Sequence, residues 1–552
     1  MQTTRRTGNL AVAFPSSASP ATPTPRPMPK TLSAAFLLPL FLSLLGAVLP
    51  AQGDLAARID AVKEFQKYFK KAKEEAQLVE AVFTLKGNEC VPAAEALLKL
   101  LTHKHESVQK AALDVLETYR EPATYTAWIE ELPKVRDAQQ AAVLIQVLGR
   151  AQQTAAVPAI VQVAGDPKAQ PVVQYEAARA LQRIGGDGGA ALLGTLVGAA
   201  DPLVRMAAID AIGALKLRQH SDAVVARVAD DEWQVQSAAI AAIAQLRPQQ
   251  AVQPLIDLMR ATGRLRTECA EALFQVTGLD FGVDPDRWQE QWNVLMSIDG
   301  YRIPTDEELA QKAASRKKYD EFYGKKEETN TFAGIPTTST NVLFIIDVSG
   351  SMDDLVVERE KFQGYRDYKR FTIVQTELLN TIDSLTADTN FDIVAFATDL
   401  DVWKKRLVPA NVVNRDAAKS WVRGLKPIGG SESQELAQVG LGGAANLAAG
   451  KTNTLKALLY TFGEDPDKPS KAAVTGFDKE AVKRPLDTVY FLSDGRPSVG
   501  KLIDTNEILE EVKKHNEVFR VVIHTVAIGE FQKEFLRTLA MQNGGVFVDL
   551  GR

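Results

Sequence analysis

The period of the hydrophobic pattern changes near residue 340, which divides the chain into regions of different predicted structure. Between about residues 54 and 300, the chain contains similar stretches in which small and apolar residues recur at i, i+4, i+7 and i+8, which is one face of a helix. From Val342 onward, short and largely apolar runs alternate with segments of helical period. The first pattern predicts helices throughout, and the second predicts strands that alternate with helices.

The helical region repeats itself at a fixed spacing. The stretches Val173–Leu181, Val204–Ile212 and Val235–Ile243 share one arrangement of small and apolar residues and follow each other at 31-residue intervals. Fixed-period similarity of this length is typical of repeat architectures. Asp201-Pro202 lies between apolar runs, where a turn and a helix start are expected. Each unit is therefore predicted to be two short antiparallel helices. The pattern resembles HEAT-like repeats, which stack into an all-α solenoid.

The C-terminal region, about residues 337–552, is predicted to be a doubly wound, Rossmann-like α/β domain. Five apolar runs are expected to be buried parallel strands: Val342–Ile346, Phe391–Phe396, Thr488–Leu492, Val521–Ala527 and Val546–Val548. Helices are expected between them at Phe371–Asp383, Leu455–Phe462, Glu507–His515 and Glu530–Met541. Residues 301–336 carry mixed charges followed by Thr, Gly and Pro, and are expected to link the solenoid, residues 54–300, to this domain.

The first 51 residues are predicted to be a secretory signal peptide. Residues 1–30 contain four basic residues and no acidic one, and a mostly apolar stretch, residues 31–51, follows them. Residues 1–27 add nothing that such a signal needs, which leaves a later translation start as an alternative. An uncleaved anchor is a second alternative, but Pro39 and Pro50 interrupt a spanning helix. The sequence therefore predicts an exported protein, periplasmic, cell-surface or secreted, with no membrane span after cleavage.

Composition narrows the classes of function. The chain has 552 residues, with 64 basic and 69 acidic side chains, and its formal net charge is −5. It is 45% hydrophobic and 24% charged, which is ordinary for globular proteins and excludes a multi-span membrane protein. The mildly acidic balance argues against nucleic-acid binding. Cys90 and Cys269 are too few for a disulfide scaffold and are expected to be small core residues.

Side chains with oxygen atoms follow two of the predicted strands. Asp347, Ser349 and Ser351 come directly after the first strand, and Asp494 follows a later one. Thr452 stands just before a predicted helix and offers a third hydroxyl. Ligands of doubly wound sheets bind beyond the carboxyl ends of the strands, so these side chains are expected to meet there. Carboxylates and hydroxyls are ligands that a hard divalent cation prefers. Two carboxylates only balance such an ion, which can then bind a carboxylate from a partner.

These residues strongly resemble the metal-ion-dependent adhesion site (MIDAS) of von Willebrand factor type A (VWA) domains, and the resemblance covers about residues 337–552. The family pattern is Asp-x-Ser-x-Ser, a distant Thr and a distant Asp. Carried over, its metal ligands are Asp347, Ser349, Ser351, Thr452 and Asp494. The resemblance implies one magnesium, manganese or calcium ion and a protein ligand that offers it an acidic side chain. It also implies a binding or adhesion-type protein rather than an enzyme, with no catalytic residues.

The third hydroxyl has two candidates. In the resembling family the threonine often follows a Gly-Gly pair, and Gly429-Gly430-Ser431 stands at that distance here. Thr452 lies further along the chain but is followed by Asn453 and a predicted helix, as the family pattern expects. We therefore expect Thr452 to be the ligand, and the segment 431–450 to be an inserted loop near the metal.

The main hypothesis is a binding protein in which the solenoid is a scaffold or a second interaction surface. Two alternative functions are also considered. One is a structural scaffold whose metal only stabilises the fold. The other is a nucleotide-hydrolysing enzyme that uses Lys451 and Thr452, because Ala445–Thr452 fits a relaxed phosphate-loop pattern. No apolar strand precedes Ala445, although such a loop needs a strand-to-helix turn to aim its amides at phosphates. His524 lies inside an apolar run and is expected to be a core residue.

Overall fold

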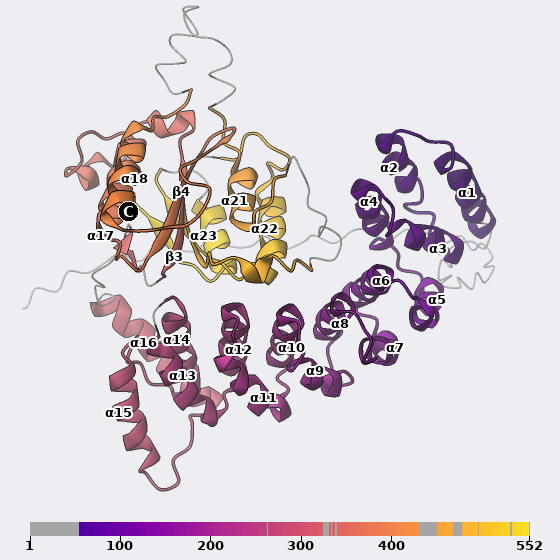
Figure 1. The fold of residues 1–552 in the computed structure, drawn as a ribbon, viewed down its shortest axis with the longest axis horizontal. Coiled ribbons are helices and arrows are strands. Elements are labelled where there is room, and N and C mark those ends of the chain that lie inside the picture. The colour runs from indigo at the N-terminus through magenta and orange to yellow at the C-terminus, as the bar shows by residue number, and fades with distance from the viewer. Residues whose placement is uncertain are drawn as a thin grey trace, which may run out of the picture. The chain divides into compact units, whose positions relative to one another are not determined.

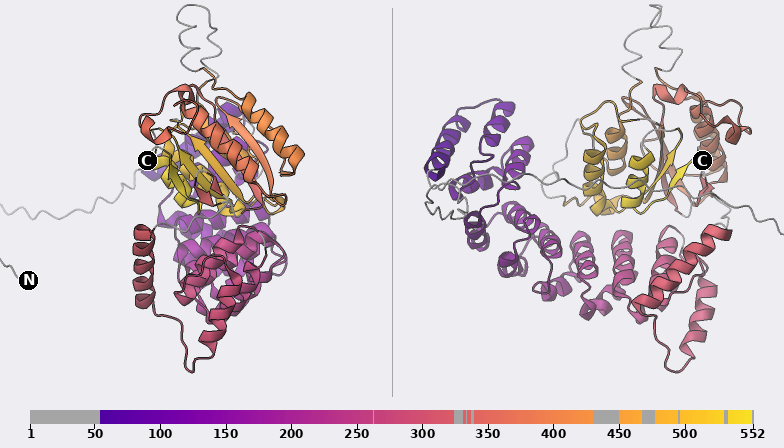
Figure 2. Two further views of the ribbon diagram at one scale, coloured as in Figure 1. Left: turned by 90° about the vertical axis from the view of Figure 1, so that its left-hand side faces the viewer. Right: turned by 180° about the vertical axis from the view of Figure 1, so that it is seen from behind.

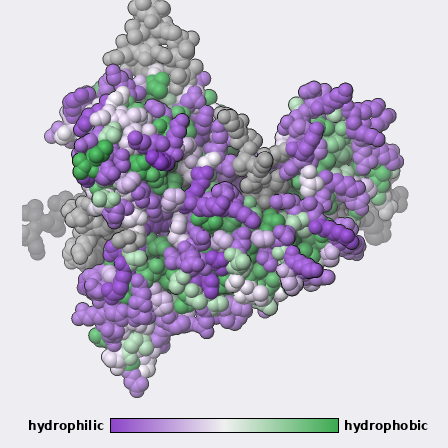
Figure 3. Space-filling model, viewed as in Figure 1, coloured by the Kyte–Doolittle hydropathy of each residue, from purple (hydrophilic) through white to green (hydrophobic). Residues whose placement is uncertain are grey.

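The computed structural model describes residues 54–261, 263–323, 331–332, 334–336, 339–429, 450–466, 477–494, 496–529 and 533–550. The predicted signal peptide and Ser431 lie outside these residues. Helices α1 to α16 come first along the described chain and an α/β domain follows them (Figure 1). Within the described ranges, no helix is long and apolar enough to cross a membrane. On the face drawn in Figure 3, hydrophilic residues predominate and hydrophobic ones form small scattered patches.

The first region consists of helices joined by short turns. Its helices are α1 (Asp54–Phe69), α2 (Glu75–Phe83), α3 (Val91–Leu100), α4 (Glu106–Leu116), α5 (Pro122–Glu131), α6 (Ala138–Arg150), α7 (Val157–Ala164), α8 (Pro171–Ile184), α9 (Ala190–Leu196), α10 (Pro202–Ala214), α11 (Ser221–Ala226), α12 (Trp233–Leu246), α13 (Val252–Met259), α14 (Leu265–Thr277), α15 (Pro285–Met296) and α16 (Asp306–Tyr323). Helices α6, α8, α10, α12 and α14 pack against one another in succession, which forms the spine of a solenoid.

The three repeats expected from the 31-residue spacing fall within α8, α10 and α12, so this prediction is confirmed. Ala177, Ala208 and Ala239 are completely buried where these helices pack together. The Asp201 side chain accepts a hydrogen bond from the Leu203 amide at 3.0 Å and caps α10. Small side chains at the contact and a capped turn between units are what stacked helical pairs require.

The end of the solenoid extends into the segment expected to be a linker. Helix α16 occupies much of that segment and lies against the last repeat, because Arg316 contacts Glu271 at 2.9 Å and stacks over Phe274. Trp288 of α15 is buried next to the same end. Cys90 and Cys269 are buried and unbonded to each other, as their sequence context predicts.

The second region is built on a seven-stranded sheet. Its strands are β3 (Asn341–Asp347), β4 (Asn390–Phe396), β5 (Leu400–Val402), β6 (Val408–Pro409), β7 (Thr488–Ser493), β8 (Val522–Ala527) and β9 (Phe547–Asp549). The order is β5-β4-β3-β7-β8-β9, with β6 also paired to β4, and β3, β4, β7, β8 and β9 are parallel. All five predicted strands are present. The short antiparallel strands β5 and β6 were not predicted, nor was the separate pair β1 (Thr331–Phe332) and β2 (Ile335–Pro336).

Helices cover both faces of this sheet (Figure 1). They are α17 (Arg370–Ser384), α18 (Val412–Gly424), α21 (Thr454–Phe462), α22 (Thr505–Phe519) and α23 (Lys533–Gln542). Phe344 and Ile346 of β3 belong to the hydrophobic cluster formed with α17 and α18. Leu343 and Ile345 belong to the cluster formed with α21, α22 and α23. The alternation of side chains along a strand therefore supplies both layers, as a doubly wound fold requires.

The solenoid contacts the α/β domain at the edge where the parallel strands begin. Arg264, which precedes α14, donates hydrogen bonds to the carbonyl oxygens of Asp487 at 2.7 Å and Arg520 at 2.6 Å. Asp487 stands immediately before β7, and Arg520 stands two residues before β8. Gln234 of α12 adds a hydrogen bond to the carbonyl oxygen of Ala481 at 3.3 Å. Figure 2 shows the α/β domain on this side of α8 to α14 from two further directions.

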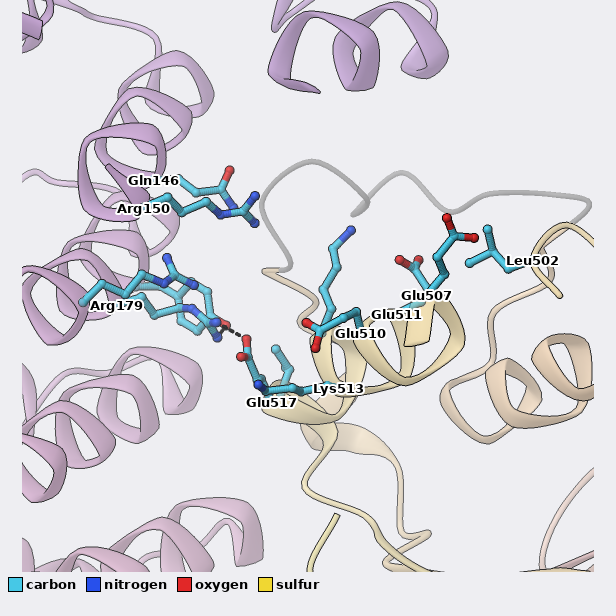
Figure 4. A pocket seen from close by; sticks show the side chains of 13 residues that line it. Gln146, Arg150, Arg179, Leu502, Glu507, Glu510, Glu511, Lys513 and Glu517 are labelled. Atoms are coloured by element: carbon cyan, nitrogen blue, oxygen red, sulfur yellow. Dashed lines mark hydrogen bonds and ion pairs between the residues drawn. The ribbon is translucent and has the colours of Figure 1, made fainter. Parts of the chain in front are cut away.

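A polar cavity of about 490 Å³ lies between α22 and the solenoid helices α6 and α8. Figure 4 shows Gln146, Arg150 and Arg179 on the solenoid side, opposite residues of α22. Arg179 forms an ion pair with Glu517 across this cavity. Contacts between solenoid and domain are therefore both polar and apolar, because a single hydrophobic cluster includes the solenoid core and one face of the sheet.

Candidate metal centre

Asp347 is the last residue of β3, the strand that lies between β4 and β7. Its side chain is completely buried. The Ser349 amide donates a hydrogen bond to Oδ1 at 2.8 Å, and the Ser493 hydroxyl donates one to Oδ2 at 2.6 Å. Each carboxylate oxygen accepts one of these hydrogen bonds and keeps a further lone pair for a cation. The sheet thus holds this carboxylate at its carboxyl edge.

Asp494 directly follows β7 and lies beside Asp347. Hydrogen bonds through Ser349 and Ser351 connect the two carboxylates. The hydroxyl oxygens of Ser349 and Ser351 are 3.3 Å apart, and the Ser351 hydroxyl donates to Asp494 Oδ1 at 2.9 Å. Asp494 is also buried. Four of the five expected ligands therefore converge in one small polar cluster.

The residues on either side of Thr452 are fixed at the same edge by backbone hydrogen bonds. The Gly350 amide donates to the carbonyl oxygen of Gly450 at 3.0 Å, and the Asn453 amide donates to that of Ala397, just past β4, at 2.9 Å. Thr452 itself is buried between these two anchors. Asn453 caps α21, so the expected helix start is observed. The backbone amide of Thr452 itself donates to the Ser498 hydroxyl at 2.9 Å, and the role of Thr452 as a metal ligand stays a prediction.

The ends of the expected inserted loop meet at this cluster. A Cβ atom on Gly350 would lie 2.6 Å from the Gly429 carbonyl oxygen, and one on Gly450 would lie 2.0 Å from the Ile428 carbonyl oxygen. Only glycine, which has no Cβ atom, allows the backbone segments to come so close at these two positions. The Ile428 amide also donates to the Val348 carbonyl oxygen at 2.8 Å. Residues 430–449 lie outside the described residues, but the positions that flank them border the Asp-x-Ser-x-Ser turn.

The electrostatics of the cluster favour a cation. Burial raises the pKa of Asp347, and the neighbouring charge of Asp494 raises it further. Burial also raises the pKa of Asp494, although Arg370 opposes this effect. Two adjacent buried carboxylates repel each other when both are ionised, and an ion between them removes that cost.

Arg370 is a member of the cluster that the sequence did not reveal. It is the first residue of α17, and its Nη1 lies 2.5 Å from Asp494 Oδ2 and 3.3 Å from the Ser351 carbonyl oxygen. The side chain is almost completely buried. A basic residue at a helix start, 19 positions beyond Ser351, carries no spacing signal, so only the fold brings it to the site.

The donor set fits a hard divalent cation. All side-chain donors are oxygen atoms, and with both carboxylates ionised and Arg370 charged the cluster carries a net charge of −1. Elsewhere in the described part of the chain, no group of three or more His, Cys, Asp or Glu residues gathers as metal ligands. Asp347, Ser349, Ser351 and Asp494 are the clustered residues that would hold Mg²⁺, Mn²⁺ or Ca²⁺, with Thr452 as the predicted fifth ligand.

Parts of the chain are similar to known proteins. The family of HEAT repeats matches residues 189–273. Inter-alpha-trypsin inhibitor heavy chain H1 of Mesocricetus auratus is 26% identical over 225 residues, which are 41% of this chain and 19% of that protein. Heavy chain H4 of Homo sapiens is 25% identical over 217 residues, 39% of this chain and 18% of that protein. The chain spans about a fifth of the length of these curated relatives.

A solved structure described as von Willebrand factor type A from Catenulispora acidiphila is also similar. It is 18% identical, has a TM-score of 0.26, and the match covers 38% of each chain. The predicted HEAT-like helical repeats are confirmed, and a doubly wound α/β domain follows them along the chain.

Proposed function

We propose that the chain is an exported, non-enzymatic binding protein whose α/β domain holds one divalent cation and binds a protein ligand through it. The observation that carries this proposal is the convergence of Asp347, Ser349, Ser351 and Asp494 at the carboxyl edge of the sheet. A bound Mg²⁺, Mn²⁺ or Ca²⁺ would accept a carboxylate from the ligand. The cluster supplies only oxygen donors and leaves the ion electrophilic.

The surface beside the cluster supports a protein as the ligand. Leu355, Val357, Tyr368 and Ile428 are exposed hydrophobic residues in the segments that border it. Leu355 follows Asp354, whose carbonyl oxygen accepts a hydrogen bond from the Arg370 amide. Apolar and aromatic side chains around a polar anchor are typical of protein interfaces. We therefore propose a ligand with an acidic side chain flanked by apolar residues.

The solenoid acts as a scaffold in this proposal. Its contacts through Arg264 lie at the opposite edge of the sheet from Asp347 and Asp494, and Gln234 adds a hydrogen bond to Ala481. That arrangement holds the domain while leaving the carboxyl edge free for a partner. The helix faces that contact the domain are already occupied, which favours a scaffold over a second ligand surface there.

Export and the class of partner remain part of the proposal. The basic and then apolar N-terminus supports secretion to a periplasm, a cell surface or the medium. The net charge of −5 supports a protein rather than a nucleic acid as the partner.

The test is a Mn²⁺ titration by calorimetry on the chain lacking residues 1–51. Wild type is expected to bind one ion, and Asp347→Asn is expected to lose at least about a hundredfold in affinity because one charged ligand is gone. Asp401→Asn, at an exposed position of β5, removes the same charge away from the cluster and should bind normally. Undiminished Mn²⁺ affinity in Asp347→Asn would refute the site. A pull-down with and without EDTA then identifies ligands whose binding needs the ion.

A second candidate is a scaffold in which the ion only stabilises the fold. The mutual repulsion of buried Asp347 and Asp494 favours it, because an ion would relieve that repulsion whether or not a ligand binds. A protein that melts cooperatively in EDTA yet loses its partner supports the binding function. A protein that keeps its partner in EDTA supports the scaffold.

A further inference from the structure

Arg370 occupies an unusual place for a permanently charged side chain. Its guanidinium is buried against Asp494 at 2.5 Å, and its Nε has no hydrogen-bond partner among the described residues. Gly529, with φ +117°, borders it so closely that a Cβ atom there would lie 3.3 Å from Cζ and Nε. The Arg370 amide is also fixed, because it donates to the Asp354 carbonyl oxygen at 3.0 Å. The fold thus makes room for this cation and holds it in one position.

The consequence is a change in the charge of the occupied site. Asp347 and Asp494 together carry −2, and arginine stays protonated at any physiological pH, so these three buried groups sum to −1. The Asp354 carboxylate lies 3.8 Å from Nη1 of Arg370, but its side chain is 56% exposed and solvent screens its charge. A divalent cation then makes the site +1, whereas the same ion with the two carboxylates alone would make it neutral. Arg370 repels the ion directly, and it also withdraws one oxygen of Asp494 into an ion pair.

We propose that Arg370 is a positioning residue that makes metal affinity depend on an anionic ligand. Alone, the ion binds weakly because the site becomes positively charged. A ligand carboxylate returns the site to neutrality, so ion and ligand each strengthen the binding of the other. The site would then hold its metal firmly only in a complex with an acidic partner. This inference rests on the proposed function, since it requires that the cluster bind a divalent cation.

The test measures Mn²⁺ affinity by calorimetry, with sodium acetate as the probe anion and sodium chloride of equal ionic strength as its control. Arg370→Gln is expected to bind Mn²⁺ at least about tenfold more tightly than wild type, because one nearby positive charge is removed. In wild type, acetate should raise the Mn²⁺ affinity, and in Arg370→Gln this increase should be much smaller. Arg370→Lys keeps the charge and should stay within about threefold of wild type.

A matched control separates the effect of a positive charge beside the metal site from the effect of the protein's net charge. Arg366 lies in the loop just before α17 and is 85% exposed, so Arg366→Gln removes one positive charge from the surface. It should change neither the Mn²⁺ affinity nor the acetate response. Equal changes in Arg366→Gln and Arg370→Gln would contradict the inference.

The possible results separate a failure of the role of Arg370 from a failure of the proposed metal site. If wild type and Arg370→Gln bind Mn²⁺ equally well, the metal site stands and the role of Arg370 is wrong. If neither binds Mn²⁺, the proposed function fails and the inference fails with it. Should Arg370→Gln not fold, the wild-type measurement still decides, because a Mn²⁺ affinity that acetate leaves unchanged overturns the inference.

Discussion

Arg520 donates from one nitrogen, Nη1, to both carboxylate oxygens of Asp210, at 3.1 and 2.9 Å. Asp210 belongs to α10 of the solenoid, and Arg520 directly follows α22 of the α/β domain. The pair is partly buried, and it joins residues 310 positions apart in the sequence. The two regions of the chain are therefore connected by a specific ionic contact in addition to apolar packing.

The first prediction concerns this pair. Asp210→Ala is expected to lower the free energy of unfolding by about 1–2 kcal/mol, because Arg520 is left without its carboxylate in a partly buried position. A double-mutant cycle with Arg520→Gln should give a coupling energy of about 1 kcal/mol in chemical denaturation. Strictly additive effects of the two substitutions would show that the contact contributes nothing.

The second prediction concerns the solenoid core. Ala208→Asp is expected to destabilise the protein by more than about 4 kcal/mol, because it buries an unpaired charge between packed helices. Ala191→Asp places the same residue at an exposed position in the first turn of α9, where an acidic side chain is tolerated. Thermal melts followed by circular dichroism compare the two. Similar melting temperatures for both variants would contradict the packing described for α10.

The third prediction concerns pH. Glu176 of α8 is fully buried, and burial raises its pKa to about 7 although Arg179, Arg183 and Arg150 oppose the shift. Because the folded-state pKa lies above the ordinary value of 4.5, the folded state binds more protons between these two values. Stability should therefore be greatest below pH 4.5 as far as this group is concerned, and should fall by about 3 kcal/mol as pH rises to 7.

Replacement of the Glu176 carboxyl group tests whether stability falls, as expected, when pH rises. Glu176→Gln is expected to be more stable than wild type at pH 8 and to lose most of the difference near pH 4, as measured by urea denaturation at each pH. Glu510→Gln, at an exposed position of α22, should leave the pH profile unchanged. A Glu176→Gln profile that runs parallel to wild type would exclude this group as the cause.

The fourth prediction concerns the third hydroxyl. Thr452→Ala is expected to weaken Mn²⁺ binding about tenfold, because a neutral oxygen ligand is lost while both carboxylates remain. Ser431→Ala is expected to leave the Mn²⁺ affinity unchanged. Calorimetry on both variants decides between the two candidates. A loss in Ser431→Ala with none in Thr452→Ala would assign the role to the earlier residue.

The fifth prediction concerns the ion and stability. A ligand that binds only the folded state stabilises it by about 2.7 kcal/mol at a hundred times its Kd. Saturating Mn²⁺ should therefore raise the melting temperature of wild type by several degrees, and that of Asp494→Asn by much less. Equal shifts in the two proteins would mean that Mn²⁺ acts elsewhere.

Much of the architecture was predictable because local patterns determine it. The spacing of Ala177, Ala208 and Ala239 requires a helix face that repeats, and the apolar run ending at Asp347 requires a strand buried on both faces. The polar residues that follow two such strands had to meet at one sheet edge. For this reason the cluster containing Asp347 and Asp494 could be assembled from the sequence alone.

The contacts that were not predicted depend on packing between distant segments. Arg370 reaches Asp494 only because α17 starts beside the end of β7, and nothing in its sequence neighbourhood indicates this. The ionic contact of Asp210 likewise depends on how the α/β domain meets α10. Short antiparallel strands such as β6 consist of two residues, too few to leave a periodic pattern.

The position of Arg264 has a mechanical consequence. Asp494 directly follows the last residue of β7. Arg264 donates a hydrogen bond to the carbonyl oxygen of Asp487, which directly precedes the first residue of the same strand. Six strand residues, about 20 Å of extended backbone, connect the two points. Tension from a ligand tethered at the carboxyl edge would therefore run along the axis of β7 and into the helical array. It would load the hydrogen bonds to β3 and β8 in shear, together along the whole strand, instead of peeling them apart one by one.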